Sequence, residues 1–333
     1  MKSKALILGV TGQDGSYMAE LLLEKGYEVH GVIRRNSQST LRNISHIVQD
    51  TEIYNKQLFL HYGDMSDSCR LNTIIAEIRP DEIYNFAAQS DVMISFAMPN
   101  YTSNVCGLGV LNLLESVRAN GLERRTRIYQ SSTSELFGKL YDEKINENSR
   151  IWPRSPYGCA KAYAHYISVN YREAYDMFIC SGFLFNHESP RRGEEFVTRK
   201  ITKAIARIKL GLQDDITLGN LSSKRDWGYA PDYVEACWLM LQQDKPDDYV
   251  IATGECYSVM DFVIKSFAYA GLDYRNHLKT DKNLIRPSEV DILIGDSTKA
   301  REKLGWTPKV SLDEMVKRMV DSDYQKEYSK INK

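Results

Sequence analysis

The stretch Lys4-Ala-Leu-Ile-Leu-Gly9-Val-Thr-Gly12-Gln-Asp-Gly15 decides the fold. An apolar run of strand length enters three glycines spaced three residues apart, and a helical pattern follows from Ser16 to about Lys25. Such glycines let a strand turn sharply into a helix and let a pyrophosphate approach backbone N–H groups at the helix N-terminus. Glycine-rich turns are common, but the strand before and the helix after favour a dinucleotide-binding turn over a purely structural one.

The second predicted strand, Glu28–Ile33, ends at two arginines, Arg34 and Arg35. An NAD enzyme places an Asp or Glu about 20 residues after the last glycine to bind the ribose hydroxyls. Arg35 occupies that place in this chain. Two guanidinium groups there favour a 2′-phosphate, and a solvated basic turn is the alternative. The sequence therefore predicts NADP as the cofactor.

The rest of the first half alternates predicted strands with predicted helices. Further strands are expected at 58–62, 82–86, 127–130 and 178–183, and a long helix at 104–118. This rhythm predicts an α/β fold, a Rossmann-type doubly wound parallel sheet. Ligands of such sheets bind beyond the carboxyl ends of the strands, where Asp64, the loop 87–90, Thr133 and Glu135 fall.

The later chain is less regular and predicts a smaller substrate-binding lobe. We expect an NADP-binding domain over residues 1–185 and a mainly sugar-nucleotide-binding domain over 186–333, with the chain crossing back near 217–254.

Composition is that of a soluble enzyme acting on a small molecule. The 333 residues can bury a large core, and 43 basic side chains balance 44 acidic ones. Without a basic excess, neither nucleic acid nor an anionic membrane surface is an expected partner. No apolar run approaches the ~20 residues of a membrane span. The six cysteines form no C-x-x-C pair and no cluster with histidine, so we expect reduced thiols, no metal and a cytoplasmic protein.

The chemistry is predicted to lie at Ser155-Pro156-Tyr157-Gly-Cys-Ala-Lys161. Ser155 is a good N-cap and Pro156 a good first helical residue, which places Tyr157 and Lys161 on one helical face. A phenol with a pKa near ~10 is a poor base, but a nearby ammonium and a cationic nicotinamide would favour the phenolate. Tyr157 would then remove the proton of a substrate hydroxyl while its carbon gives hydride to NADP⁺. An ordinary amphipathic helix surface is the alternative.

With these features, several longer runs resemble the GDP-mannose 4,6-dehydratase family of extended short-chain dehydrogenase/reductases. The runs are 9–16, 132–135, 186–193, 196–200, 225–228 and 286–289, and the resemblance covers nearly the whole chain. It implies catalytic roles for Thr133, Glu135 and Tyr157, and a contact of Lys161 with the nicotinamide ribose. It implies cofactor contacts from Gly9, Thr11, Gly12, Gln13, Asp14, Gly15, Arg34, Arg35, Asp64, Met65, Phe86, Ala87, Ala88, Gln89, Ser90, Tyr101, Lys161, His187 and Arg192.

A carboxylate in addition to the tyrosine and lysine distinguishes a dehydratase from an epimerase. Once C4 of the sugar is a ketone, a base can remove the C5 proton and an acid can help the C6 hydroxyl to leave as water. Glu135, two residues after Thr133, would reach the same pocket from an extended segment. A helix N-terminal acid or cap partner is the structural alternative for Glu135. The resemblance also offers substrate-binding candidates, some with guanidinium groups suited to a diphosphate: Ser90, Asn186, Glu188, Val197, Lys200, Arg225, Arg286 and Glu289.

Five positions in three places depart from the family pattern and bear on the sugar. Asp91 stands where a histidine is expected, Phe86-Ala87 replaces Leu-Gly, and Gly158-Cys159 replaces Ala-Val in the catalytic helix. The expected substrate is therefore GDP-mannose or a GDP-manno-heptose, converted to its 4-keto-6-deoxy form. A nucleotide-sugar 4-epimerase or reductase and a non-catalytic NADP-binding scaffold are the alternative functions. The resemblance further implies a homo-oligomer, a tetramer, with the cofactor near subunit contacts.

Overall fold

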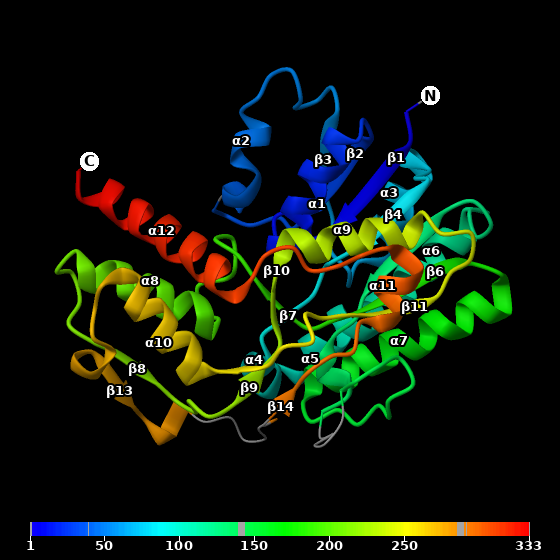
Figure 1. Cartoon of the computed structure of the whole chain (residues 1–333). Helices are drawn as coiled ribbons and strands as arrows, with labels where there is room; N and C mark the ends of the chain where they lie inside the picture. Colours follow the sequence, from blue (N-terminus) through cyan, green and yellow to red (C-terminus); the bar gives the residue numbers. More distant parts are fainter. Residues whose placement is uncertain (1, 39, 139–143, 285–289, 291, 333) are drawn as a thin grey trace.

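The computed structural model describes residues 2–38, 40–138, 144–284, 290 and 292–332 (Figure 1). Within these residues, seven parallel strands form one sheet in the order β11-β6-β5-β4-β1-β2-β3. The strands are β1 (Lys4–Leu8), β2 (Glu28–Ile33), β3 (Leu58–Tyr62), β4 (Glu82–Asn85), β5 (Arg127–Ser131), β6 (Phe178–Leu184) and β11 (Asp248–Ile251). The predicted doubly wound parallel sheet is confirmed.

Strand β1 lies at the centre of the sheet, and its alternating side chains enter two separate cores. Ala5 and Ile7 belong to one apolar cluster, and Leu6 and Leu8 to the other. All four side chains are fully buried. The strand order reverses at β1, between β2 and β4, and such a switch point opens a crevice beyond the carboxyl ends of the strands.

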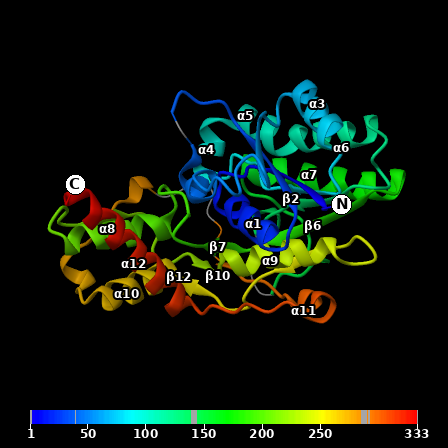
Figure 2. The ribbon, with the colours of Figure 1, turned by 90° about the horizontal axis from the view of Figure 1, so that it is seen from above.

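Helices cover both faces of this sheet (Figure 2). Helices α1 (Gln13–Glu24) and α9 (Ala230–Leu241) pack in the core of Ala5 and Ile7. Helices α3 (Ser68–Ile78), α6 (Gly109–Ala119) and α7 (Pro156–Tyr175) pack in the core of Leu6 and Leu8. The remaining short helices of this part are η1 (Leu41–Ile44), α2 (Ser45–Val48), α4 (Val92–Ala97), α5 (Pro99–Ser103) and η3 (Ser134–Leu136).

Two helices begin earlier than predicted. Helix α1 begins at Gln13, directly after the extended residue Gly12. The helix predicted at 104–118 is a longer helical region, in which α5 leads through a π-helical turn, η2 (Asn104–Leu108), into α6. A Cβ on Gly109 would lie 2.8 Å from the Cβ of Met65, so glycine lets this helical region approach the loop after β3.

The second lobe is built mainly from three helices around their own apolar core (Figure 1). These are α8 (Val197–Lys209), α10 (Val259–Ala270) and α12 (Leu312–Ile331), with the short helices η4 (Tyr274–Asn276) and η5 (Lys282–Leu284). Strands β8 (Ile216–Leu218) and β13 (Leu278–Thr280) pair with each other and pack in this core. The other small strands are β7 (Asn186–Glu188), β9 (Lys224–Arg225), β10 (Trp227–Tyr229), β12 (Tyr257–Ser258) and β14 (Ile292–Leu293). Between them, the chain returns to the large sheet through α9 and β11, against which α11 (Thr298–Leu304) packs.

In the described part of the chain, no helix combines the length and apolar character needed to span a bilayer. The six cysteines are all free thiols.

Candidate active site

A cavity of about 840 Å³ lies beyond the carboxyl ends of the central strands and reaches into the second lobe. Its wall brings together most of the site residues expected from sequence. These are Gly9, Thr11, Gly12, Gln13, Asp14, Gly15, Arg34, Asp64, Met65, Phe86, Ala87, Ala88, Ser90, Thr133, Glu135, Tyr157, Lys161, Asn186, His187, Glu188, Arg192, Val197, Lys200 and Arg225. Arg286 and Glu289 lie outside the described residues.

The glycine turn has the geometry that its spacing requires. Gly9 adopts a φ of +83°, and a Cβ on Gly15 would lie 2.3 Å from the carbonyl oxygen of Gly9. Gly12 differs from both, because its added Cβ would approach only the Gly9 oxygen, at 3.2 Å. The space beside Gly12 is therefore open, and the first turn of α1 with its unpaired N–H groups borders the cavity.

An ion pair joins this turn to strand β7. Asp14 Oδ2 lies 2.9 Å from His187 Nε2, and the other ring nitrogen of His187 faces the carbonyl oxygen of Phe185 at 2.7 Å. Burial alone would raise the pKa of Asp14, but the charge and hydrogen bond of His187 outweigh it and lower that pKa. Burial alone would lower the pKa of His187, but Asp14 outweighs it and raises that pKa.

Gln13 reinforces the same junction. Its amide nitrogen donates to the carbonyl oxygen of His187 at 3.1 Å, and its amide oxygen accepts from Ser189 Oγ at 2.8 Å. Two residues that the resemblance assigns to the cofactor, Gln13 and Asp14, thus also hold the loop after β7 against the glycine turn.

Three expected cofactor residues do not line the cavity: Arg35, Gln89 and Tyr101. Arg34 follows β2 directly, lines the cavity and donates to the hydroxyl of Tyr101 at 2.6 Å, whereas Arg35 donates to the carbonyl of Asn36. Gln89 turns toward α5 and hydrogen-bonds Thr102 and the backbone of Asp91. The spacing of about 20 residues after Gly15 points to Arg35, but β2 ends at Ile33, and Arg34 is the arginine that lines the cavity.

The predicted helix start at Ser155 is confirmed. Ser155 Oγ accepts from the backbone N–H of Gly158 at 3.0 Å, and the first turn of α7 presents Tyr157 to the cavity. Lys161 is buried and donates to the carbonyl oxygen of Ser131 at 2.7 Å. Burial lowers the pKa of Lys161.

The protein groups around Tyr157 raise its pKa, whereas the sequence predicted that its pKa would be lowered. Burial raises the pKa of Tyr157 well above its usual value, and the Glu135 charge adds to that rise. A hydrogen bond with Thr133 acts in the opposite direction but does not outweigh burial. The Lys161 ammonium lies 5.9 Å from the centre of the Tyr157 ring and donates its hydrogen bond to Ser131.

Glu135 reaches the cavity by a different backbone from the one expected. Thr133 is extended, but residues Ser134–Leu136 form the 3₁₀ turn η3, in which the backbone N–H of Glu135 donates to Thr133 Oγ1 at 3.3 Å. The extended segment predicted through Glu135 is therefore wrong, because the Thr133 hydroxyl favours a turn. Glu135 is half-buried, and its carboxylate forms no hydrogen bond or ion pair with the described residues.

The candidate substrate-binding residues on the second-lobe side of the cavity differ in burial and in the number of their polar contacts. Glu188 is buried, accepts from Thr198 Oγ1 at 2.5 Å and lies 3.2 Å from Arg192 Nε. Arg225 lies on β9 and is also buried. Lys200 is half-exposed, with Glu195 at 3.9 Å.

Sequence reasoning missed several lining residues from the second lobe, among them Thr217, Asn220, Ser223, Trp227 and Asn283. They come from short strands, loops and the 3₁₀ turn η5, and among them only Trp227 falls in one of the runs that resemble the family, 225–228. Asp91, where the family pattern has a histidine, also lines the cavity. It caps α4, accepting from the backbone N–H groups of Met93 and Ile94 at 2.8 and 3.1 Å.

Known proteins resemble this chain over nearly its full length. A family model described as GDP-mannose 4,6 dehydratase matches residues 6–319. The protein named GDP-mannose 4,6 dehydratase 1 in Arabidopsis thaliana is 54% identical, over 96% of this chain and 90% of its own. The human protein named GDP-mannose 4,6 dehydratase is 50% identical, over 97% of this chain and 92% of its own.

Solved structures share the fold at lower identity. A UDP-glucose 4-epimerase of Thermus thermophilus in complex with NAD superimposes with a TM-score of 0.81 at 26% identity, covering 96% of this chain and 98% of its own. A dTDP-glucose 4,6-dehydratase of Bacillus anthracis gives a TM-score of 0.83 at 21% identity, over 98% of both chains, and shows the fold alone. Since the family model spans most of the sequence and the relatives match almost from end to end, the chain belongs to the GDP-mannose 4,6-dehydratase family.

Proposed function

We propose that this protein is an NADP-dependent GDP-sugar 4,6-dehydratase, a carbon–oxygen lyase, whose main substrate is GDP-mannose. The observation that carries the proposal is the meeting of three groups on one cavity wall: the glycine turn, the Tyr157–Lys161 helix and the Thr133–Glu135 turn. Relatives named for this activity, about half identical over nearly their full length, support it.

The residues around the glycine turn fit a dinucleotide. The open side of Gly12 leaves room for a pyrophosphate, which the first N–H groups of α1 would bind. Arg34, exposed at the end of β2, would bind a 2′-phosphate as a charge-assisted partner. The neighbouring epimerase structure holds NAD, and another neighbour of the same fold holds NADPH. The choice of NADP rests on Arg34.

Tyr157 would act at C4 of the sugar. A bound nicotinamide would supply the hydride acceptor for C4 and the hydride donor for C6. Tyr157 takes the proton of the C4 hydroxyl, with Thr133 beside it to bind the same oxygen. The hydrogen bond of Lys161 to Ser131 fixes its ammonium in the cavity wall, where it would bind the ribose. Burial of the phenol means that proton removal depends on charge supplied with the ligands.

Glu135 would perform the elimination. Its half-buried carboxylate has no protein partner in the described chain, so it is available as the base toward the C5 proton and then as the acid toward the departing C6 oxygen. An epimerase needs no such group. This is why we place the protein among dehydratases rather than among 4-epimerases of the same fold.

The diphosphate would be bound by Arg225 and by Arg286, which lies outside the described residues. The residues near the sugar and nucleotide would be Ser90, Asn186, Glu188, Val197, Lys200 and Glu289. The departure at Asp91 has a structural explanation, because its carboxylate caps α4. It therefore gives no separate reason to prefer a GDP-manno-heptose. We further propose a cytoplasmic homotetramer.

The test compares GDP-mannose and GDP-manno-heptose in parallel, by mass spectrometry of the products with NADP⁺ present. We expect loss of one water from GDP-mannose, deuterium from C4 at C6, and solvent deuterium at C5. Glu135→Gln should stop water loss while some 4-keto sugar that retains its C6 oxygen still forms. Glu195→Gln is the matched control, since Glu195 is a carboxylate on the same cavity wall. Normal dehydration by Glu135→Gln, or loss of the C4 label to solvent, contradicts the mechanism.

A further inference from the structure

The C-terminal helix α12 is fastened to the cavity wall through one buried arginine. Arg199, on α8, is only 1% exposed in its side chain. Its Nε and one terminal nitrogen donate to both carboxylate oxygens of Asp323 on α12, at 3.0 and 2.6 Å. Thr202 adds a third hydrogen bond to Asp323 at 2.7 Å. A guanidinium paired in two places in this way is fixed in orientation as well as in position.

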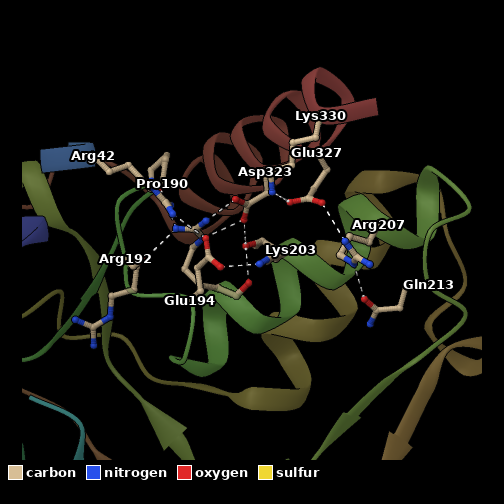
Figure 3. A network of polar contacts seen from close by, with 12 residues as sticks. Arg42, Pro190, Arg192, Glu194, Lys203, Arg207, Gln213, Asp323, Glu327 and Lys330 are labelled. Carbon is tan, nitrogen blue, oxygen red and sulfur yellow. Dashed lines mark hydrogen bonds and ion pairs between the residues drawn. The ribbon is translucent and has the colours of Figure 1, made fainter. Parts of the chain in front are cut away.

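The remaining nitrogen of Arg199 holds the loop between β7 and α8. It donates to the carbonyl oxygens of Pro190 and Arg192, at 3.0 and 2.7 Å. Lys326, one turn after Asp323 on α12, donates to the same Pro190 oxygen at 2.9 Å. Figure 3 labels Pro190, Arg192 and Asp323 of this network, and the side chain of Arg192 extends away from the two helices.

This loop is part of the cavity wall. Arg192 lines the cavity, and so do Glu188 before it and Phe196 after it. The Arg192 guanidinium stacks on the ring of Phe196, 3.6 Å from its centre. On its other side, the loop is held to α1 by Arg191, which donates to Ser16 and Glu20. Glu194 of the same loop accepts from Arg42 of η1 at 2.9 Å and from Lys203 of α8 at 2.6 Å. The loop is therefore anchored at α1, at η1 and at α8, and α12 supports the α8 anchor through Asp323.

We propose that Arg199, oriented by Asp323, is a positioning residue that sets the place of Arg192 in the cavity. Asp323 reaches the loop through Arg199, and Arg199 reaches it through the two loop carbonyls. The helix α12 thereby becomes part of the ligand-binding apparatus, although the described part of α12 contributes no residue to the cavity wall. The effect on substrate or NADP⁺ affinity rests on the proposed function, whereas the effect on the loop does not.

A second ion pair between the same helices provides the control. Arg207, two turns further along α8, lies 3.1 Å from Glu327 of α12 (Figure 3). This pair fastens α8 to α12 as Arg199 does, but Arg207 hydrogen-bonds none of the loop carbonyls. A change at Arg207 therefore weakens the contact between the helices and leaves the loop anchor in place.

The experiment measures the loop directly by limited trypsin digestion, because Arg191 and Arg192 are themselves cleavage sites. Arg199→Lys keeps the positive charge but cannot reach two carboxylate oxygens and two carbonyls at once. Mass spectrometry identifies the fragments cleaved after Arg191 or Arg192. We expect this cleavage to be at least about tenfold faster in Arg199→Lys than in Arg207→Lys. The Kd for NADP⁺ or the KM for the sugar nucleotide should rise about tenfold, with a smaller change in kcat.

A second variant covers the case in which Arg199→Lys does not fold. Arg199→Met with Asp323→Leu removes both buried charges together, an exchange that is often neutral for stability. It still removes both hydrogen bonds from residue 199 to the loop, so the same rise in cleavage is expected. Equal cleavage in Arg207→Lys and in the folded Arg199 variants overturns the proposal, whatever the enzymatic activity. Faster cleavage without any dehydratase activity in the wild type would instead contradict only the proposed function.

Discussion

Replacing Asp14 by asparagine should make the stability of this protein depend differently on pH. In the wild type, His187 faces two acceptors, the Phe185 carbonyl at 2.7 Å and the Asp14 carboxylate at 2.9 Å. A neutral imidazole can donate to only one of them, so the pair favours the doubly protonated ring. An asparagine can donate its amide N–H to a neutral ring, so Asp14→Asn removes the reason for His187 to be charged.

The size of the effect follows from the burial of the pair. The side chains of Asp14 and His187 are 19% and 11% exposed, so solvent screens their interaction only weakly. A hydrogen bond to a charged group contributes about 1.5–3 kcal/mol. The cost of a stranded buried charge is larger, but His187 avoids it by losing its proton. We therefore expect Asp14→Asn to lower the free energy of unfolding by about 1.5–3 kcal/mol at the pH where the pair is fully charged.

The pH window follows from the two pKa directions. The pKa of His187 is raised in the folded state, so its contribution is complete below its unfolded value of about 6.5 and is lost as pH rises through the folded pKa. The pKa of Asp14 is lowered, so its contribution is complete above about 3.9 and is lost as pH falls through the folded pKa. The difference between wild type and Asp14→Asn should therefore be largest between about pH 4 and 6.5.

Urea unfolding from pH 4 to 9 measures this difference, and NMR titration of labelled histidine measures the His187 pKa. In Asp14→Asn that pKa should fall below its ordinary value, since burial then acts without the carboxylate. The other histidines in the same spectra are the internal control. A stability difference that is constant with pH, or a His187 pKa unchanged by the substitution, would refute the reasoning.

Three further predictions concern the cofactor, the base and the assembly. Arg34→Ala should reduce the preference for NADP⁺ over NAD⁺ by about tenfold in titrations of stripped protein, while Arg35→Ala has little effect, because only Arg34 lines the cavity. Tyr157→Phe should lower kcat at least ~10²-fold without lowering Tm, and turnover near that of the wild type would remove Tyr157 as the base. Light scattering should give a tetramer at micromolar concentration, and a fully active monomer would contradict the proposed assembly.

Local signals predicted the elements that position the site. Strand β2 has the predicted bounds, Glu28–Ile33, because its apolar run is bounded by charge at both ends. Helix α7 begins where Ser155 and Pro156 indicated, because a hydroxyl cap and a proline both act within one turn. In each case the interaction that sets the boundary lies within a few residues of it.

Single-residue choices at the site were less predictable. Arg34 and Arg35 are chemically identical, and only the point at which β2 ends decides which one meets the cavity. Gln89 belongs to a loop that lines the cavity, yet its side chain turns toward α5 because Thr102 and the Asp91 backbone are there to bind it. Glu135 leaves the extended path because the Thr133 hydroxyl caps a turn. Such choices depend on neighbours that spacing alone does not specify.

Contacts between distant segments could not be predicted from motifs at all, and they change how the motif residues must be tested. Asp14 pairs with His187, and Glu188 accepts from Thr198, before any ligand is considered. Substitution of these residues therefore alters stability and ligand binding together, and a loss of activity alone cannot assign them a role. Glu135 is different, because its carboxylate forms no hydrogen bond or ion pair with the described residues. A change in activity at Glu135, with the stability unchanged, reports directly on chemistry.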